Sequence, residues 1–153
     1  MAKQVINVGA AEDDGTGESL RSGGVKINAN FTELYDRTAV LQLIAAENIS
    51  ALRVLASDDL GQVVYADNNS VGQAFKVMGI SISTGLLGAN VTLQTEGILT
   101  DAGWSWAGTG PLFVGTNGVL TQTPPTNGYS VVVGWPTNPT TIFININHAI
   151  ILL

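Results

Sequence analysis

The only histidine is the first residue whose type could do chemistry. His148 lies in an apolar C-terminal run with no acidic residue close to it in the sequence, and the chain has no cysteine. A catalytic base or a metal ligand needs such partners, although a three-fold axis could bring three copies of one histidine onto one metal. No serine lies in a nucleophile-elbow pattern, so a Ser-His-Asp triad is not predicted. We expect no catalytic and no metal-binding residues, and a structural or interface role for His148.

A cluster of acidic residues near the N-terminus is the second candidate. Glu12, Asp13, Asp14 and Glu18 could supply the several oxygen ligands that Ca²⁺ prefers. Their spacing departs from the EF-hand loop, which has acids at alternate positions and a later Glu. The turn at 15–17 lacks the further glycine or the Lys-Ser/Thr of phosphate-binding loops. The cluster therefore predicts a loop before a helix that Thr16 or Ser19 caps, with the acids near the positive end of the helix, and we expect no cofactor.

Three tryptophans are open to two interpretations. Trp104 and Trp106 are two residues apart, and Trp135 follows later. Paired aromatic rings can stack on sugar rings, which would suit a protein that binds a glycan. The alternative is that these rings anchor the core or a subunit interface, where aromatic side chains bury a large area. We favour the core or interface interpretation and keep glycan contact as a candidate role for Trp104 and Trp106.

The composition narrows the class of protein. The chain has 153 residues, a formal net charge of −6 and only 12% charged residues against 45% hydrophobic ones. Nucleic-acid binding is disfavoured because phosphate neutralisation needs clustered Lys and Arg. The acidity also disfavours an anionic membrane surface, and the longest apolar stretch, Ile142–Leu153, is too short to span a bilayer. A neutral polar surface is typical of a particle component that packs against neighbours.

The helix expected after the acidic loop has a regular apolar period. Its apolar positions alternate in steps of four and three residues, which is a heptad seam. The seam consists of Leu20, Gly24, Ile27, Phe31, Leu34, Thr38, Leu41 and Ala45, and the same spacing continues through Asn48, Leu52 and Leu55. Two arrangements suit this pattern: an amphipathic helix that lies on its own β-domain, or a short parallel coiled coil of three chains.

The rest of the chain reads as short strands. Alternation is strict in residues 91–95 and resumes after Gly97, while Asn117-Gly118 between two apolar runs is a strong hairpin signal. We therefore predict a mainly β protein with an N-terminal helical segment, built as a small antiparallel β-sandwich or barrel and trimeric. The predicted parts are an N-terminal docking arm (1–19), a helical trimerisation segment (20–56) and an antiparallel β-domain (57–153).

The N-terminal part resembles a motif of tailed-phage structural proteins. The resemblance is carried by Ile6-Asn7-Val8-Gly9, by residues 13–21 (DDGTGESLR) and by residues 26–35 (KINANFTELY). Tail-fibre, baseplate and other virion proteins carry close versions, whose usual form has Asn-Asp-Gly-Thr-Gly-Asp and an Ala-Phe pair before the Lys. Here Asp13 and Glu18 replace the Asn and the second Asp, and Gly23-Gly24 lies near the Ala-Phe position. The resemblance implies a virion component without fixing its location.

A second segment is similar to a β-domain found near the C-termini of phage fibre proteins, and more distantly to small capsid cement proteins. It comprises residues 91–100 (VTLQTEGILT), Trp104-Ser105-Trp106 and residues 110–125 (GPLFVGTNGVLTQTPP), and residues 141–146 fit the last strand of that domain. Together the two resemblances imply a trimeric virion protein.

Our leading hypothesis is a non-enzymatic capsid decoration or head-fibre protein on the virion surface, assembled in the host cytoplasm. It would form a homotrimer and attach through its N-terminal arm to the major capsid protein or another virion protein. The alternative is a tail-fibre or baseplate attachment module that binds a host surface glycan. A glycan depolymerase is the third hypothesis, but the acids beyond the helix form no recognisable pair. These acids are Asp58, Asp59, Asp67, Glu96 and Asp101.

The hypotheses assign roles to particular residues. The residues expected to dock on the virion are Val5, Ile6, Val8, Asp14 and Thr16. Those expected at the trimer interface are Ile27, Phe31, Leu34, Thr38 and Leu41.

Overall fold

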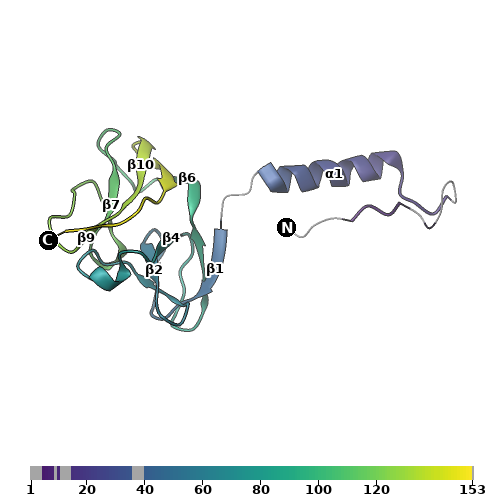
Figure 1. The fold of residues 1–153 in the computed structure, drawn as a ribbon. Helices are drawn as coiled ribbons and strands as arrows, with labels where there is room; N and C mark the ends of the chain where they lie inside the picture. The colour runs from purple at the N-terminus through teal and green to yellow at the C-terminus, as the bar shows by residue number, and fades with distance from the viewer. Residues whose placement is uncertain (1–4, 9, 11–14, 36–39, 153) are drawn as a thin grey trace. The chain divides into compact units, whose positions relative to one another are not determined.

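The structure is a computed structural model that describes residues 5–8, 10, 15–35 and 40–152 (Figure 1). The chain divides into two compact units, an N-terminal unit of residues 1–37 and a β-domain of residues 38–153. The described residues of the N-terminal unit include one helix, α1 (Leu20–Tyr35). No helix in the described part of the chain is long and apolar enough to cross a membrane.

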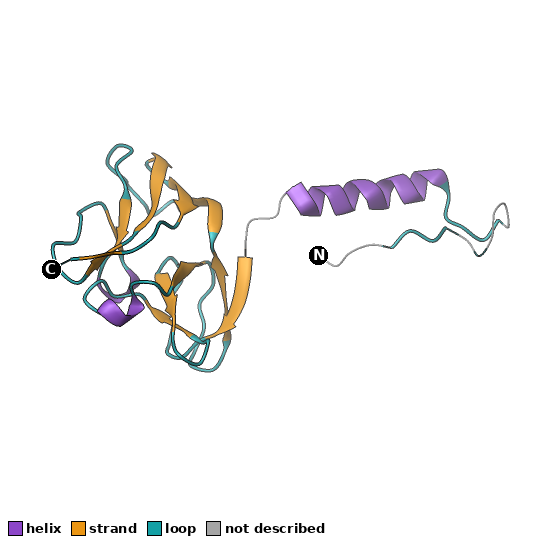
Figure 2. Ribbon diagram, in the orientation of Figure 1, coloured by secondary structure: helices purple, strands orange, loops and turns teal. Residues whose placement is uncertain are grey.

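The β-domain contains two five-stranded antiparallel sheets and a small third sheet (Figure 2). The first sheet has the order β1 (Val40–Ile44), β5 (Asn90–Gln94), β4 (Val77–Ser81), β2 (Val54–Ser57), β3 (Val63–Tyr65). The second has the order β6 (Glu96–Thr100), β11 (Thr141–Asn145), β10 (Val132–Asn138), β7 (Leu112–Val114), β8 (Leu120–Thr121). The third pairs β12 (Ile150–Ile151) with β9 (Tyr129–Ser130), and 3-10 turns occur at Val71–Gln73 and Thr116–Gly118.

The main core lies between the two large sheets. Buried side chains of β2 and β4 from the first sheet meet those of β7, β8, β10 and β11 from the second in one apolar cluster. A second cluster covers the other face of the first sheet. Strand β2 contributes to both clusters, because Val54 and Ala56 face one and Leu55 faces the other. Two sheets that share a core form a β-sandwich, as predicted from the short alternating strands.

The strands β5 and β6 carry the chain from one sheet to the other. Only Thr95 separates them, and Gly97 has a φ of +94°, which glycine adopts without a steric penalty. The buried Gln94 side-chain amide donates hydrogen bonds to the carbonyl oxygens of Glu96 (3.0 Å) and Ile98 (2.9 Å). These bonds satisfy backbone acceptors at the point where the ladder changes sheets.

The hairpin predicted at Asn117-Gly118 is confirmed. Strands β7 and β8 pair antiparallel through Phe113–Thr121 and Val114–Leu120. Asn117 and Gly118 both have positive φ, 51° and 70°. A Cβ at position 118 would lie 2.6 Å from the Val54 carbonyl oxygen, so this turn needs glycine for space as well as for conformation.

The predicted helix is correct at its start and too long at its end. It ends at Tyr35, and the seam positions from Leu41 onward fall in β1, in a loop and in β2. Leu41 and Leu43 lie opposite the core residues Leu93 and Val91 of β5, while Leu52 has a φ of 63°. The sequence VLQLI at 40–44 is compatible with a helix and with a strand, and its pairing with β5 makes it a strand here. The β-domain therefore begins at residue 38, before the predicted residue 57.

Candidate functional site

The N-terminal unit folds back on itself through polar contacts of Asn7. The Glu18 backbone N–H donates to the Asn7 carbonyl oxygen (2.8 Å), and the Asn7 N–H donates to Glu18 Oε1 (3.0 Å). The Asn7 side-chain amide also donates to the carbonyl oxygen of Thr16 (3.0 Å). These three bonds join the segment at residues 5–8 to the segment that leads into α1. Asn7 takes part in all three of these bonds and thus holds the two segments together.

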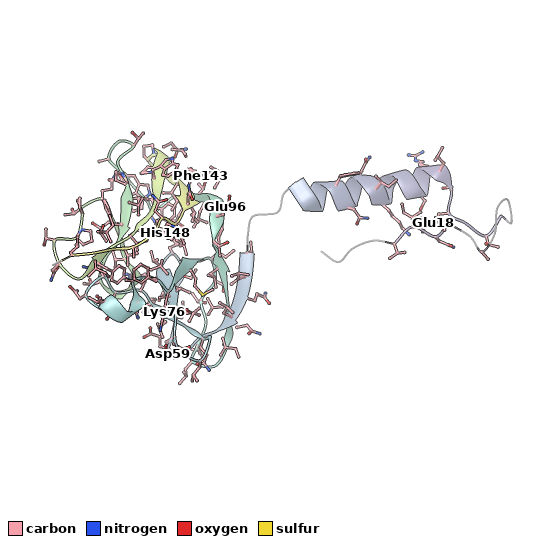
Figure 3. All side chains as sticks on the ribbon, viewed as in Figure 1. Glu18, Asp59, Lys76, Glu96, Phe143 and His148 are labelled. Carbon is pink, nitrogen blue, oxygen red and sulfur yellow. The ribbon has the colours of Figure 1, made fainter. Side chains whose placement is uncertain are left out.

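Glu18 and Lys26 close the other side of this loop. Lys26 Nζ forms an ion pair with Glu18 and also donates to the carbonyl oxygen of Val5 (3.0 Å). Ser22 Oγ donates to the second carboxylate oxygen of Glu18 (3.1 Å). The hydrogen bond from Lys26, followed by that from the Asn7 backbone, lowers the pKa of Glu18 from its ordinary 4.5. One carboxylate therefore holds residues 5–7 against α1 (Figure 3).

The start of α1 is capped as the sequence predicts. Ser19 Oγ accepts a hydrogen bond from the Ser22 N–H (3.2 Å), and the Ser19 carbonyl accepts from the Gly23 N–H (2.9 Å). Gly23 is buried, and a Cβ there would meet Ile6 Cγ2 at 3.6 Å, an ordinary contact. Ile6 is the half-buried member of the docking set, and it packs at Gly23.

Most of the apolar side chains described in this unit are uncovered. Leu20 is 95% exposed and Val8 84%, and every fully buried apolar residue among those described belongs to the β-domain. The exposed large apolar residues of the unit are Val5, Val8, Leu20, Val25, Ile27 and Phe31. Leu20, Ile27 and Phe31 share the seam with Gly24, whose Cβ position is open space. A helix with such an uncovered stripe fits burial against another chain.

The other predicted docking and interface residues have different surroundings. Thr16 lies in the hydrogen-bonded loop, where its Oγ1 accepts from the Ala10 N–H (3.3 Å). Leu34 belongs to α1, whereas Leu41 lies in β1 and not in a helix. Asp14 and Thr38 lie outside the described residues. Sequence reasoning missed Asn7 and Lys26 as organising residues, although both belong to the quoted motif.

The tryptophans separate into two groups. Trp104 and Trp106 are partly buried and pack against the main core, with ring centroids 5.6 Å apart. The Trp106 Nε1–H is buried without a hydrogen-bond partner among the described residues. Trp135 instead lies on β10 beside Phe143, again 5.6 Å between centroids, and is 38% exposed. Core packing of Trp104 and Trp106 agrees with the favoured interpretation of this pair.

His148 lines a groove of about 450 Å³ in the β-domain together with Glu96. Neither side chain has a polar partner within the part of the chain that the structure describes. No group of three or more His, Asp or Glu side chains among the described residues could hold a metal ion.

Two comparisons relate this chain to known proteins. The family described as bacteriophage T4 gp9/10-like protein, N-terminal, matches residues 3–107, which is more than half of the chain. The baseplate wedge protein gp10 of Enterobacteria phage T4 is 67% identical over 33 residues. Those residues make up 22% of this chain and 6% of gp10, so the chain matches only a small part of that relative.

Proposed function

The chain belongs to the bacteriophage T4 gp9/10-like N-terminal family and is a structural protein of a tailed-phage virion, and from this premise we propose that it is a non-enzymatic attachment module of the baseplate or tail. The family and the similarity to gp10 favour this alternative over our leading hypothesis of capsid decoration. Its partners are then other virion proteins of the baseplate or tail.

In this proposal the N-terminal unit makes the attachment. The observation that carries it is the contrast between a loop fixed by polar contacts of Asn7, Glu18 and Lys26 and an apolar surface left uncovered on the same unit. Three copies of α1 would bury the seam at Ile27 and Phe31 against one another, and Val5 and Val8 would contact a neighbouring virion protein. Burial of this surface supplies the binding free energy, and no covalent bond changes.

The attachment is tested with two exposed residues. We expect the double variant Val5→Asp, Val8→Asp to lose co-sedimentation with particles that lack the protein, while remaining folded, because both side chains are exposed. Leu60→Asp is the matched control, since Leu60 is 82% exposed in the β-domain. Deletion of residues 1–19 should have the same effect as the double variant. Normal particle binding by both altered proteins would refute docking through this segment.

The trimer is tested by solution mass. Light scattering after size exclusion should give about three times the 15.9 kDa chain mass. Ile27→Asp should give the monomer mass, because a carboxylate in the seam would be buried without a partner. If the native chain has the monomer mass, attachment through the N-terminal unit remains possible, but the proposed three-chain interface is refuted.

Contact with a host surface glycan is a second candidate role for the β-domain. The specific observation is the Trp104–Trp106 ring pair, whose members are partly exposed. Glycan-array binding that is lost in Trp104→Ala and retained in Trp135→Ala would support this role. A blank array for the native chain would count against it.

A further inference from the structure

The groove that contains His148 and Glu96 brings together three separate segments of the β-domain. They are residues 74, 75, 77 and 78 before and within β4, residues 95–96 at the β5–β6 crossing, and residues 145–149 from the end of β11 onward. At about 450 Å³, the groove is large enough for a long side chain or a small ligand. Glu96 and His148 both line it, and both are labelled in Figure 3.

Glu96 gives this groove an unneutralised negative charge. No side chain in the described ranges donates a hydrogen bond to its carboxylate or forms an ion pair with it. The nearest cation in the sequence, Lys76, binds Asp59 instead, at 2.5 Å. His148 also has no ion-pair partner among the described residues. An occupant that carries a positive charge would complement the groove.

The groove also has apolar side chains in its lining. Phe75 is 76% exposed although it is aromatic, and Val77 and Met78 line the groove beside it. A long basic side chain combines both properties, because its methylene stem covers apolar surface while its charged head seeks a carboxylate. The face of an aromatic ring also attracts a cation. An aliphatic ligand would leave Glu96 unpaired, and an anion would be repelled by it.

We propose that this groove binds a basic side chain, Lys or Arg, presented by a neighbouring virion protein. The head group pairs with the Glu96 carboxylate, and the stem lies against Phe75 and Met78. The identity of the partner as a virion protein rests on the proposed function, whereas the preference for a cation rests on the groove alone. The β-domain thereby gains a second contact with the particle, separate from the N-terminal unit.

The preference for a cation is tested with small probes on the full chain. Amide NMR shifts are followed during titration with n-pentylammonium, and with pentanoate as the anion of matched length. We expect saturable shifts at residues 75–78, 95–96 and 145–149 with pentylammonium only, with a dissociation constant on the order of millimolar. Glu96→Gln should weaken this binding about three- to fivefold, and Asp101→Asn, which makes the same charge change elsewhere, should not. Phe75→Ala should weaken it while Glu96 stays in place.

Each outcome of the titration decides the inference. Saturation by pentylammonium that depends on Glu96 supports the proposal. Shifts of equal size with pentanoate, shifts unchanged in Glu96→Gln, or no saturation at all overturn it.

A particle experiment separates this inference from the proposed function. Glu96→Gln should reduce co-sedimentation with particles several-fold without changing the solution mass. If the native chain fails to bind particles but still binds pentylammonium, the proposed function fails and the cation site stands. If the native chain binds particles and Glu96→Gln binds equally well, the groove has no role in attachment.

Discussion

The two units of this chain are stabilised in different ways. The β-domain buries Leu55, Ile80, Ile142 and other large side chains completely within itself. The N-terminal unit leaves most of its described large apolar side chains exposed and depends on a network around Glu18, Asn7 and Lys26. Such exposed polar contacts each contribute little to stability, whereas burial of large apolar side chains contributes much more.

This difference indicates which unit needs a partner. A domain with a closed core is expected to fold alone, while a 16-residue helix with an open apolar stripe is marginal in water. Signals from the β-domain should therefore report the intrinsic stability of the fold, and signals from the N-terminal unit should report assembly with a partner. All three tryptophans lie in the β-domain, so their fluorescence follows that unit alone, and helical circular dichroism follows α1.

The largest expected effect comes from removing residues 1–37. The remaining fragment should keep the tryptophan-detected unfolding free energy of the full chain within about 0.5 kcal/mol, because no core residue is removed. It should also be entirely monomeric by light scattering. A fragment that remains trimeric would place the three-chain interface in the β-domain and reverse the comparison.

A core truncation should affect the β-domain strongly. Leu55 is fully buried in the second cluster, so Leu55→Ala should lower the unfolding free energy by about 3 kcal/mol through lost burial and a residual cavity. The measurement is urea unfolding followed by tryptophan fluorescence. The control Leu60→Ala, at an exposed leucine, should change the free energy by less than about 0.5 kcal/mol. Equal effects of the two variants would contradict the closed core.

Alkaline pH should weaken the β-domain through Tyr129. Its hydroxyl is buried without a hydrogen-bond partner among the described residues, and burial, with a smaller effect of Asp67, raises the pKa of Tyr129 from 10.0 to about 12. The unfolded state releases the phenolic proton first, so stability is complete below pH 10 and falls by about 2–3 kcal/mol as the pH approaches 12.

Tyr129→Phe tests this cause. The variant should remove most of the loss of stability above pH 10 and should cost little at neutral pH, because the hydroxyl makes no described hydrogen bond. Tyr65→Phe is the comparison, since the Tyr65 hydroxyl accepts a hydrogen bond from the Ser50 N–H (2.6 Å). An unchanged alkaline transition in Tyr129→Phe would assign it to another group.

The difference between local and long-range contacts explains which elements could be predicted from the sequence. Strands that alternate strictly, such as Val91–Thr95, were predicted because the two-residue period is local, and the Asn117-Gly118 turn has its own local signal. The start of α1 was predicted for the same reason from two local capping candidates, Thr16 and Ser19, of which Ser19 makes the capping hydrogen bond. The end of α1 was not, because VLQLI at 40–44 fits both periods, and only pairing with β5, far along the chain, selects the strand.

The candidate sites show the same limit. The docking segment was predicted from a contiguous motif, but the roles of Asn7 and Lys26 depend on a fold-back that spacing does not reveal. The groove was not predicted at all, because its lining comes from three distant segments. His148 and Glu96 each had no partner in the sequence, and the fold places both at one groove.

Gly24 offers a smaller test that separates helix stability from assembly. A Cβ at Gly24 meets no atom within 4 Å, so Gly24→Ala should strengthen α1 by up to about 1 kcal/mol and raise helical circular dichroism. If sister helices approach closely at this seam position, the added methyl should reduce the trimer mass despite the stronger helix. Asn28→Ala, at an exposed position of α1 outside the seam, should raise helicity and leave the mass unchanged. A full trimer in Gly24→Ala would exclude close approach at this residue.

The smallest expected effect is the response of the N-terminal unit to acid. The pKa of Glu18 is lowered in the folded unit, chiefly by the hydrogen bond from Lys26. Glu18 therefore stabilises the fold-back above pH 4.5 and loses this contribution as the pH falls below that value through the folded-state pKa. The protection factor of the Asn7 amide proton, which is donated to this carboxylate, should fall over this range while tryptophan fluorescence stays constant. Glu18→Gln keeps the shape of the side chain and loses the charge, so the protection factor of this amide in that variant should be low already at neutral pH and nearly independent of pH. Protection of the Asn7 amide that persists in Glu18→Gln would mean that the negative charge of this side chain is not what holds the N-terminal segment against α1.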